Sequence, residues 1–138
     1  MFRYLFSKLQ NMKQLNKQLR KELSKLSSKE VIERSGLYPV QVSNWRNGYD
    51  FKTIPLLRKL AQVIGKDIYL DGFTENIEER ILNIIVFETQ NLSTHNLSIM
   101  TGMHKNTFIN MRLGKVPQLS TMLLIADKFN ADINFVLI

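Results

Sequence analysis

The most informative feature of the sequence is a segment that occurs twice. Residues 26–48 and 92–114 align at a constant offset of 66 and are identical at six of 23 positions, whereas ordinary residue usage gives roughly one or two matches. The identical pairs are Leu26/Leu92, Ser27/Ser93, Gly36/Gly102, Asn44/Asn110, Arg46/Arg112 and Gly48/Gly114. The chain is therefore interpreted as a tandem duplication.

The similarity continues beyond this segment after one deleted residue. At an offset of 65, residues 54–68 align with residues 119–133 and keep matching apolar residues every three or four positions. No linker rich in Gly, Ser or Pro separates the copies, so we expect two packed lobes rather than domains on a flexible tether. The predicted units are 1–70, with a basic N-terminal helix, and 71–138.

Each unit carries the local signals of three short helices. Gly36 and Gly102 stand where a tight turn needs a left-handed backbone, which glycine adopts without a β-carbon penalty. Pro39 suits the first position of a second helix, and the third apolar segment ends in Gly65 or Asn130, both good left-handed caps. The pattern predicts helix, tight turn, helix, loop and helix in each unit.

A longer helix is predicted at the N-terminus. From Leu5 to Leu26, apolar residues recur every three or four positions, which is the spacing of one apolar stripe on a helix. Its other faces are basic. Three uses of the stripe are open: packing on the same chain is favoured, a coiled-coil dimer seam is second, and adsorption to a membrane is third.

Two short apolar runs follow the third helices, at 67–70 and 132–138. Their matched placement predicts two strands that pair antiparallel, and a further short helix is the alternative for each run. Thr74 is predicted to cap another helix, with Glu75, Glu78 and Glu79 in its first turns. These glutamates fit a helix-dipole role better than a catalytic one.

The charge of the chain favours a polyanionic partner. It has 19 Lys+Arg and 12 Asp+Glu, a formal charge of +7. Residues 1–70 hold 14 basic and 5 acidic side chains, a net +9, and residues 71–138 hold 5 and 7, a net −2. Nucleic acid leads as the partner and a membrane surface follows, while a merely solvated lysine face is the alternative.

Enzyme and metal chemistry are not expected. The chain has no cysteine, so disulfides, a thiol nucleophile and Cys-bearing zinc sites are excluded, and only His95 and His104 remain as imidazole ligands. It has no HExxH, GxGxxG or phosphate-binding glycine loop. No apolar run reaches the roughly 18 residues that cross a bilayer. We expect a cytoplasmic protein without cofactor or catalytic activity.

The repeated pattern resembles the Cro and lambda-repressor type helix-turn-helix family of prokaryotic DNA-binding domains. The residues that carry the resemblance are the Leu-Ser pair that opens the first motif helix, the glycine at the turn, and Trp45-Arg46-Asn47-Gly48 at the close of the second helix. In the second unit Met111 replaces the aromatic residue. The resemblance implies a mainly α fold with two such units in tandem, forming an internal pseudo-dimer. The matched runs at 67–70 and 132–138 add a short antiparallel β pair at its centre, and a further short helix for each run is the alternative that the family offers.

The resemblance also implies which residues contact DNA, because the second motif helix lies in the major groove and the first crosses the backbone. Expected base-reading residues are Val40, Gln41, Asn44, Lys105, Asn106, Thr107 and Asn110. Expected phosphate contacts are Ser28, Arg46, Lys52, Thr94, Arg112 and Lys115. His104, at the start of the second such helix, either touches DNA or is plain surface.

The function implied is that of a sequence-specific double-stranded DNA-binding protein, a repressor or other transcriptional regulator of a phage, plasmid or conjugative element. One chain would act as its own dimer, and a homodimer through the N-terminal helix stays open. The alternative is an interaction protein, such as an inhibitor or transfer-complex accessory factor, that reuses the fold with DNA binding lost or secondary. The apolar Val40 is its main support.

Overall fold

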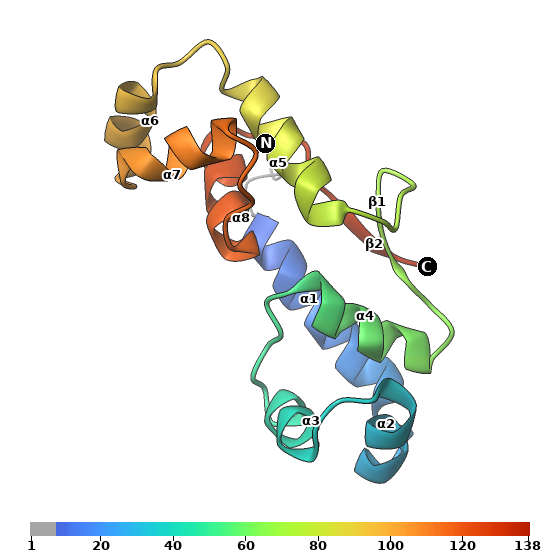
Figure 1. Cartoon of the computed structure of the whole chain (residues 1–138). Coiled ribbons are helices and arrows are strands. Elements are labelled where there is room, and N and C mark those ends of the chain that lie inside the picture. The colour runs from blue at the N-terminus through green and yellow to red at the C-terminus, as the bar shows by residue number, and fades with distance from the viewer. Residues whose placement is uncertain (1–7) are drawn as a thin grey trace. The chain divides into compact units, whose positions relative to one another are not determined.

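The structure is a computed structural model, which describes the backbone of residues 8–138 and the side chains of residues 11–138. Within this part the chain is mainly helical, with eight helices and two short strands (Figure 1). The helices are α1 (Lys8–Leu23), α2 (Ser28–Ser35), α3 (Pro39–Arg46), α4 (Ile54–Val63), α5 (Ile77–Glu88), α6 (Thr94–Thr101), α7 (Lys105–Arg112) and α8 (Leu119–Lys128). The strands are β1 (Ile68–Leu70) and β2 (Phe135–Leu137).

The contacts divide the chain into two compact units. Gln10–Thr74 and the C-terminal segment Asn134–Ile138 form one, called the N-terminal unit below. Glu75–Ile133 makes up the body of the other, called the C-terminal unit. None of the helices among the described residues is long and apolar enough to cross a membrane.

The helices repeat with the same offsets as the sequence. Helices α2 and α6 each have eight residues and start 66 positions apart, and so do α3 and α7. Helices α4 and α8 each have ten residues at an offset of 65. The predicted order of three short helices is therefore confirmed in both units.

The ends of the first helix of each triplet show why the repeat folds alike. The Ser27 and Ser93 hydroxyls accept hydrogen bonds from the third backbone N–H of α2 and α6, at 3.2 and 3.0 Å, which satisfies a donor that the helix leaves free. Gly36 and Gly102 end these helices with nearly the same positive φ, 74° and 73°, where a β-carbon would be strained.

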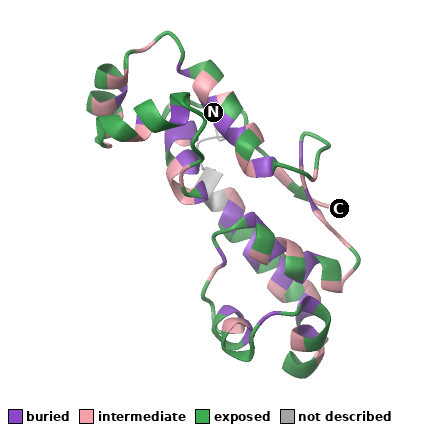
Figure 2. Cartoon of the chain, viewed as in Figure 1, coloured by how far each residue is buried: buried purple, intermediate pink, exposed green. Residues whose placement is uncertain are grey.

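The apolar stripe of α1 is buried inside the N-terminal unit (Figure 2). Met12, Leu15, Leu19 and Leu23 are all buried. Packing on the same chain, the favoured interpretation of the stripe, is therefore confirmed for these four positions. Leu5, where the predicted stripe begins, lies outside the described residues.

A buried asparagine ties α1 to α3 and to the loop that follows it. The Asn16 Oδ1 accepts hydrogen bonds from Trp45 Nε1 and from the Phe51 backbone N–H, both at 2.9 Å. Its Nδ2 donates to the carbonyls of Phe51, at 3.0 Å, and Met12, at 2.9 Å. Because these groups are buried and out of reach of water, each of them needs a hydrogen-bond partner within the protein.

The core of the C-terminal unit is built mainly from aliphatic residues. Ile81 and Ile85 of α5 are buried, as are Phe108 of α7 and Met122 of α8. The expected cap of α5 is wrong: the helix begins after Asn76, which has a positive φ of 53°. Thr74 precedes the helix, and its carbonyl accepts a hydrogen bond from the Arg58 guanidinium. This tertiary contact outweighs the local capping signal.

The two apolar runs form strands rather than short helices. Strands β1 and β2 pair antiparallel, with Ile68 opposite Leu137 and Leu70 opposite Phe135. Asp67 and Ile138 extend the ladder by exchanging two backbone hydrogen bonds, at 2.9 and 3.1 Å. The predicted antiparallel pair is confirmed, and β2 belongs by its contacts to the N-terminal unit.

Replacing Asn16 by alanine tests how far α1 depends on this buried amide. The change leaves the Trp45 indole N–H and both backbone groups of Phe51 without partners, so we expect the free energy of unfolding to fall by about 3 kcal/mol. Urea unfolding measures it. Gln14→Ala, an exposed change on the same helix, is the control and should cost less than ~0.5 kcal/mol. Equal losses for the two variants would contradict the assignment.

Candidate nucleic-acid interface

Helix α7 turns a polar face away from its unit. Lys105, Asn106 and Asn110 are exposed, while Phe108 and Met111, on the opposite side of the helix, are buried. At about 100° per residue, positions 106, 109, 110 and 113 share one side. We call these four residues, Asn106, Ile109, Asn110 and Leu113, together with the exposed Lys105 at the edge of this side, the outward face of α7. Its amide and ammonium groups are free to bind a ligand.

Two members of this face are apolar and were not predicted as contacts. Ile109 and Leu113 are exposed, and in the other unit the equivalent residues are the polar Ser43 and Asn47. Comparing the two units position by position would have found them. Thr107, which was predicted, is half-buried and lies off this face.

Helix α3 presents the equivalent face in the N-terminal unit. Val40 and Asn44 are exposed, and Val42 and Trp45 point into the core. Gln41 is half-buried and its Oε1 accepts a hydrogen bond from the Tyr38 backbone N–H at 2.9 Å. This contact caps α3 and uses one of the two lone pairs of the Gln41 amide oxygen, which holds the side chain against the backbone.

The start of α6 is a better anion site than the start of α2. Ser28 and Thr94 are the first residues of these helices, where free backbone N–H groups favour negative charge. At α2, the Glu30 carboxylate already occupies this end by accepting from the Ser27 N–H and hydroxyl. The equivalent residue in α6 is the neutral Asn96, and α6 has no acidic residue in its first turn. A phosphate would therefore meet less repulsion at Thr94.

The two equivalent arginines hold each unit together. The Nη2 atom of Arg46 donates to the carbonyls of Leu23, at 2.9 Å, and Leu26, at 2.6 Å. The Nη2 atom of Arg112 donates to Thr89, at 3.1 Å, and to Leu92. All three positions are related by the same offset of 66. Each guanidinium thus ties its helix to the end of α1 or α5 and to the turn that follows it, and only its remaining N–H groups can reach a phosphate.

The two predicted lysine contacts are exposed but not equivalent. Lys115 directly follows Gly114, and its backbone N–H donates to the Asn110 carbonyl at 2.9 Å. The same bond in the N-terminal unit is made by Tyr49, whose N–H donates to Asn44 at 3.0 Å. Lys52 lies three residues further along the loop. Among the described residues, no carboxylate lies within ion-pair distance of Lys52 or Lys115.

Negative charge is kept away from the α6–α7 segment. No Asp or Glu occurs between Glu88 and Asp127, although this stretch holds Lys105, Arg112 and Lys115. The net charge of −2 for residues 71–138 therefore hides a local +3. Counting charge by halves of the chain missed this signal, and counting it by helix finds it.

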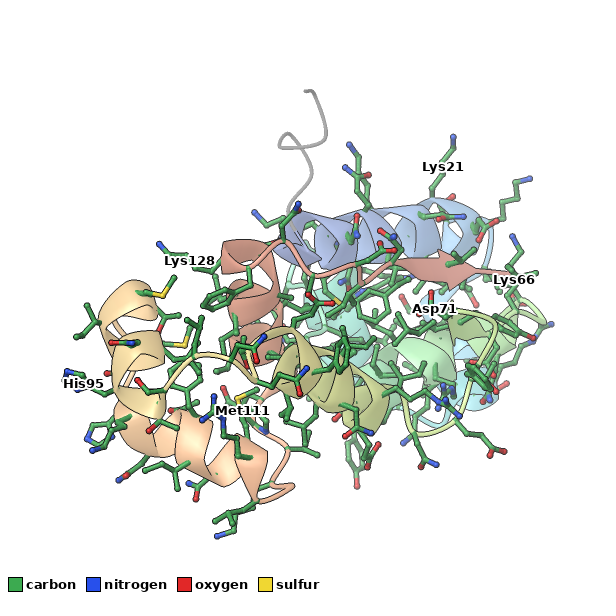
Figure 3. The ribbon with its side chains drawn as sticks, turned by 90° about the horizontal axis from the view of Figure 1, so that it is seen from above. Lys21, Lys66, Asp71, His95, Met111 and Lys128 are labelled. Atoms are coloured by element: carbon green, nitrogen blue, oxygen red, sulfur yellow. The ribbon has the colours of Figure 1, made fainter. Side chains whose placement is uncertain are left out.

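In the N-terminal unit the carboxylates are mostly paired. Asp50, Asp67 and Glu22 lie 2.7–2.8 Å from Arg20, Arg58 and Lys66, and Glu30 lies 3.6 Å from Arg34. Several lysines on and around α1 are exposed, and Lys21 projects away from its helix (Figure 3). These exposed lysines supply an unneutralised positive surface, which attracts a polyanion.

The histidines have separate positions and no shared site. His104 is the N-cap of α7, and its Nδ1 accepts a hydrogen bond from the Asn106 backbone N–H at 3.1 Å. His95 lies on the exposed side of α6 (Figure 3). Within the described part of the chain, no three His, Cys, Asp or Glu side chains come close enough together to hold a metal ion.

Comparison with known proteins gives no match: no protein-family model, curated protein or solved structure is significantly similar to this chain. Its functional interpretation therefore depends on its own residues.

Arg46→Ala tests the structural role of the arginines without any ligand. The change removes the two hydrogen bonds that a charged, half-buried donor makes to the carbonyls of Leu23 and Leu26, so the free energy of unfolding should fall by about 2 kcal/mol. Lys52→Ala is the control, since Lys52 is exposed and unpaired, and it should change stability by less than ~0.5 kcal/mol. If thermal melting shows Arg46→Ala as stable as Lys52→Ala, the arginine does not hold the unit together.

Proposed function

We propose that this protein binds double-stranded DNA in a sequence-specific manner and acts as a transcriptional regulator. The observation that carries the proposal is the outward face of α7: exposed amide and ammonium donors on a short helix, within a stretch of 38 residues, 89–126, that has no carboxylate. A second helix with an equivalent face and the same local structure is present in the other unit.

The residues of these faces have the chemistry that base recognition requires. An asparagine amide pairs with N6 and N7 of adenine, and a lysine ammonium donates to O6 and N7 of guanine in the major groove. Asn110 and Asn44 occupy equivalent positions, with Asn106 and Lys105 beside the former. Lys52, Lys115 and the start of α6 at Thr94 then fix the protein on the phosphates.

The two units fit the role of an internal dimer. Helices α3 and α7 have the same length and start 66 positions apart, so one chain carries two equivalent candidate reading helices. Two such helices support a pseudo-dimer in which one chain occupies two half-sites. The buried stripe of α1 leaves no need for a second chain.

The mechanism is occupancy of a DNA site, without catalysis or cofactor. A repressor excludes other proteins from the DNA that it covers. In this role the protein would act in the cytoplasm. By analogy with the helix-turn-helix family, a phage, plasmid or conjugative element is its proposed genetic setting.

A second candidate is an interaction protein that reuses the fold. Its support is the exposure of Ile99 and Met100 on α6, which stand where the other unit has Glu33 and Arg34. Paired apolar side chains on a solvated helix fit contact with a protein. The polar face of α7 has no explanation in this alternative, so DNA binding is preferred.

The salt dependence of duplex binding tests the proposal. The four cationic phosphate candidates, Arg46, Lys52, Arg112 and Lys115, each displace condensed counterions, so the affinity should fall roughly 100-fold between 50 and 200 mM salt. Fluorescence anisotropy with a labelled duplex taken from a selection out of random sequences measures it. No binding, or an affinity that does not change with salt, would contradict the proposal and favour the interaction protein.

Three variants distinguish the recognition of bases from the electrostatic attraction to phosphates in the same assay. Lys105→Ala and Asn110→Ala should each weaken binding to the selected duplex by about 1 to 3 kcal/mol and affect random DNA much less. Lys52→Ala should weaken both alike and make the log–log salt slope shallower by about one unit. Equal losses on both duplexes for the α7 variants would show that α7 does not read bases.

A further inference from the structure

The outward faces of α3 and α7 differ at equivalent positions. In the N-terminal unit, Tyr38, Val40 and Tyr49 are 72%, 64% and 66% exposed. Their equivalents in the C-terminal unit are His104, Asn106 and Lys115. The backbone framework is the same in both units, because the helix bounds and the hydrogen bonds to Asn44 and Asn110 match. The difference is therefore chemical.

The exposed apolar residues lie at the two ends of the face of α3. Tyr38 is the residue before the helix and Val40 is in its first turn. The Tyr49 backbone N–H donates to the Asn44 carbonyl, which places Tyr49 beside the other end of the face. Gln41 is the polar residue next to Val40, and its amide oxygen accepts the hydrogen bond from the Tyr38 backbone N–H that caps α3. The first turn of α3 thus offers methyl groups and a phenol ring where α7 offers an amide and an ammonium.

Only one apolar group occurs on the base edges in the major groove of DNA, the C5-methyl of thymine. We propose that the N-terminal unit recognises its half-site through thymine methyl groups, with Val40 as the specificity-determining residue. This inference rests on the proposed function and names the half-site of one unit. A protein partner is the competing occupant, but Asn44 within the face and the exposed Lys52 in the following loop favour DNA.

The repeat defines how the two half-sites are related. Asn44 and Asn110 are identical, so the base pair that they contact should be the same in both, an A·T pair with the adenine towards the amide. Val40 and Asn106 differ, so the base pair that they contact should be different. A thymine methyl is expected at the base pair that Val40 contacts, and an adenine or other hydrogen-bonding edge at the base pair that Asn106 contacts.

Replacement of thymine by uracil tests the inference, since uracil lacks only the methyl group. The full chain selects a duplex from a random-sequence library, and each thymine of that duplex is then replaced by uracil in turn. At one position in one half-site, uracil should weaken binding about fourfold, the equivalent of ~0.8 kcal/mol for one buried methyl. Val40→Ala should bind the thymine and uracil duplexes equally well, so the difference should disappear at that position alone.

Val40→Asn is the matched variant, because it gives α3 the residue that α7 carries. It should lose the preference for thymine at the same position and gain one for adenine, in a new selection. Val40 is exposed, so both variants should melt within a few degrees of the parent chain, and a melting curve checks this.

The outcomes distinguish the inference from the function on which it rests. A library from which no duplex is enriched overturns both. A duplex that is bound tightly, yet with no uracil effect that depends on residue 40, overturns the inference and leaves DNA binding standing. If changes at Val40 leave every duplex affinity unchanged, the face of α3 does not contact DNA, and the inference is overturned in favour of a protein-binding surface.

Discussion

The arginine at the end of α3 and its equivalent at the end of α7 are the contacts on which the internal arrangement of each unit depends. Arg46 donates to carbonyls at the end of α1 and in the turn after it, and Arg112 does the same at the end of α5, where the helix dipole favours a cation. Because α3 and α7 are only eight residues long, they gain little stability from their own backbone. The arginines fix their orientation and leave the outward faces free for recognition.

Much of the fold could be predicted because its signals are local. The turn glycines, the serine caps and the apolar spacing act over a few residues, and each is repeated, so one unit supports the interpretation of the other. The start of α5 could not be found in this way, since a tertiary contact from Arg58 takes the carbonyl of Thr74. The burial of Asn16 could not be predicted either, because the sequence does not distinguish a buried amide from an exposed one. Its burial follows from the positions of Trp45 and Phe51, which hydrogen-bond to it.

The candidate site was predictable in its position and less so in its chemistry. Spacing places Asn44 and Asn110 correctly on the outward sides of α3 and α7, but it does not single out the exposed Ile109 and Leu113 or the half-buried Thr107. Spacing also does not reveal that the Gln41 amide oxygen accepts a hydrogen bond that caps α3. Nor does it reveal that Arg46 and Arg112 donate to backbone carbonyls, because those carbonyls lie 20 or more residues away in the chain. Comparison of the two units shows that apolar and polar side chains are exchanged at equivalent positions of their outward faces: Val40 aligns with Asn106, and Ser43 with Ile109.

We propose that one chain presents α3 and α7 as two reading helices to one DNA site. The most direct measurement is a hydroxyl-radical footprint on a selected duplex, together with the mass of the complex. The account predicts protection on two successive major-groove faces, about 34 Å or one helical turn apart, by a single chain. Protection confined to one half-turn, or two chains in each complex, would contradict it.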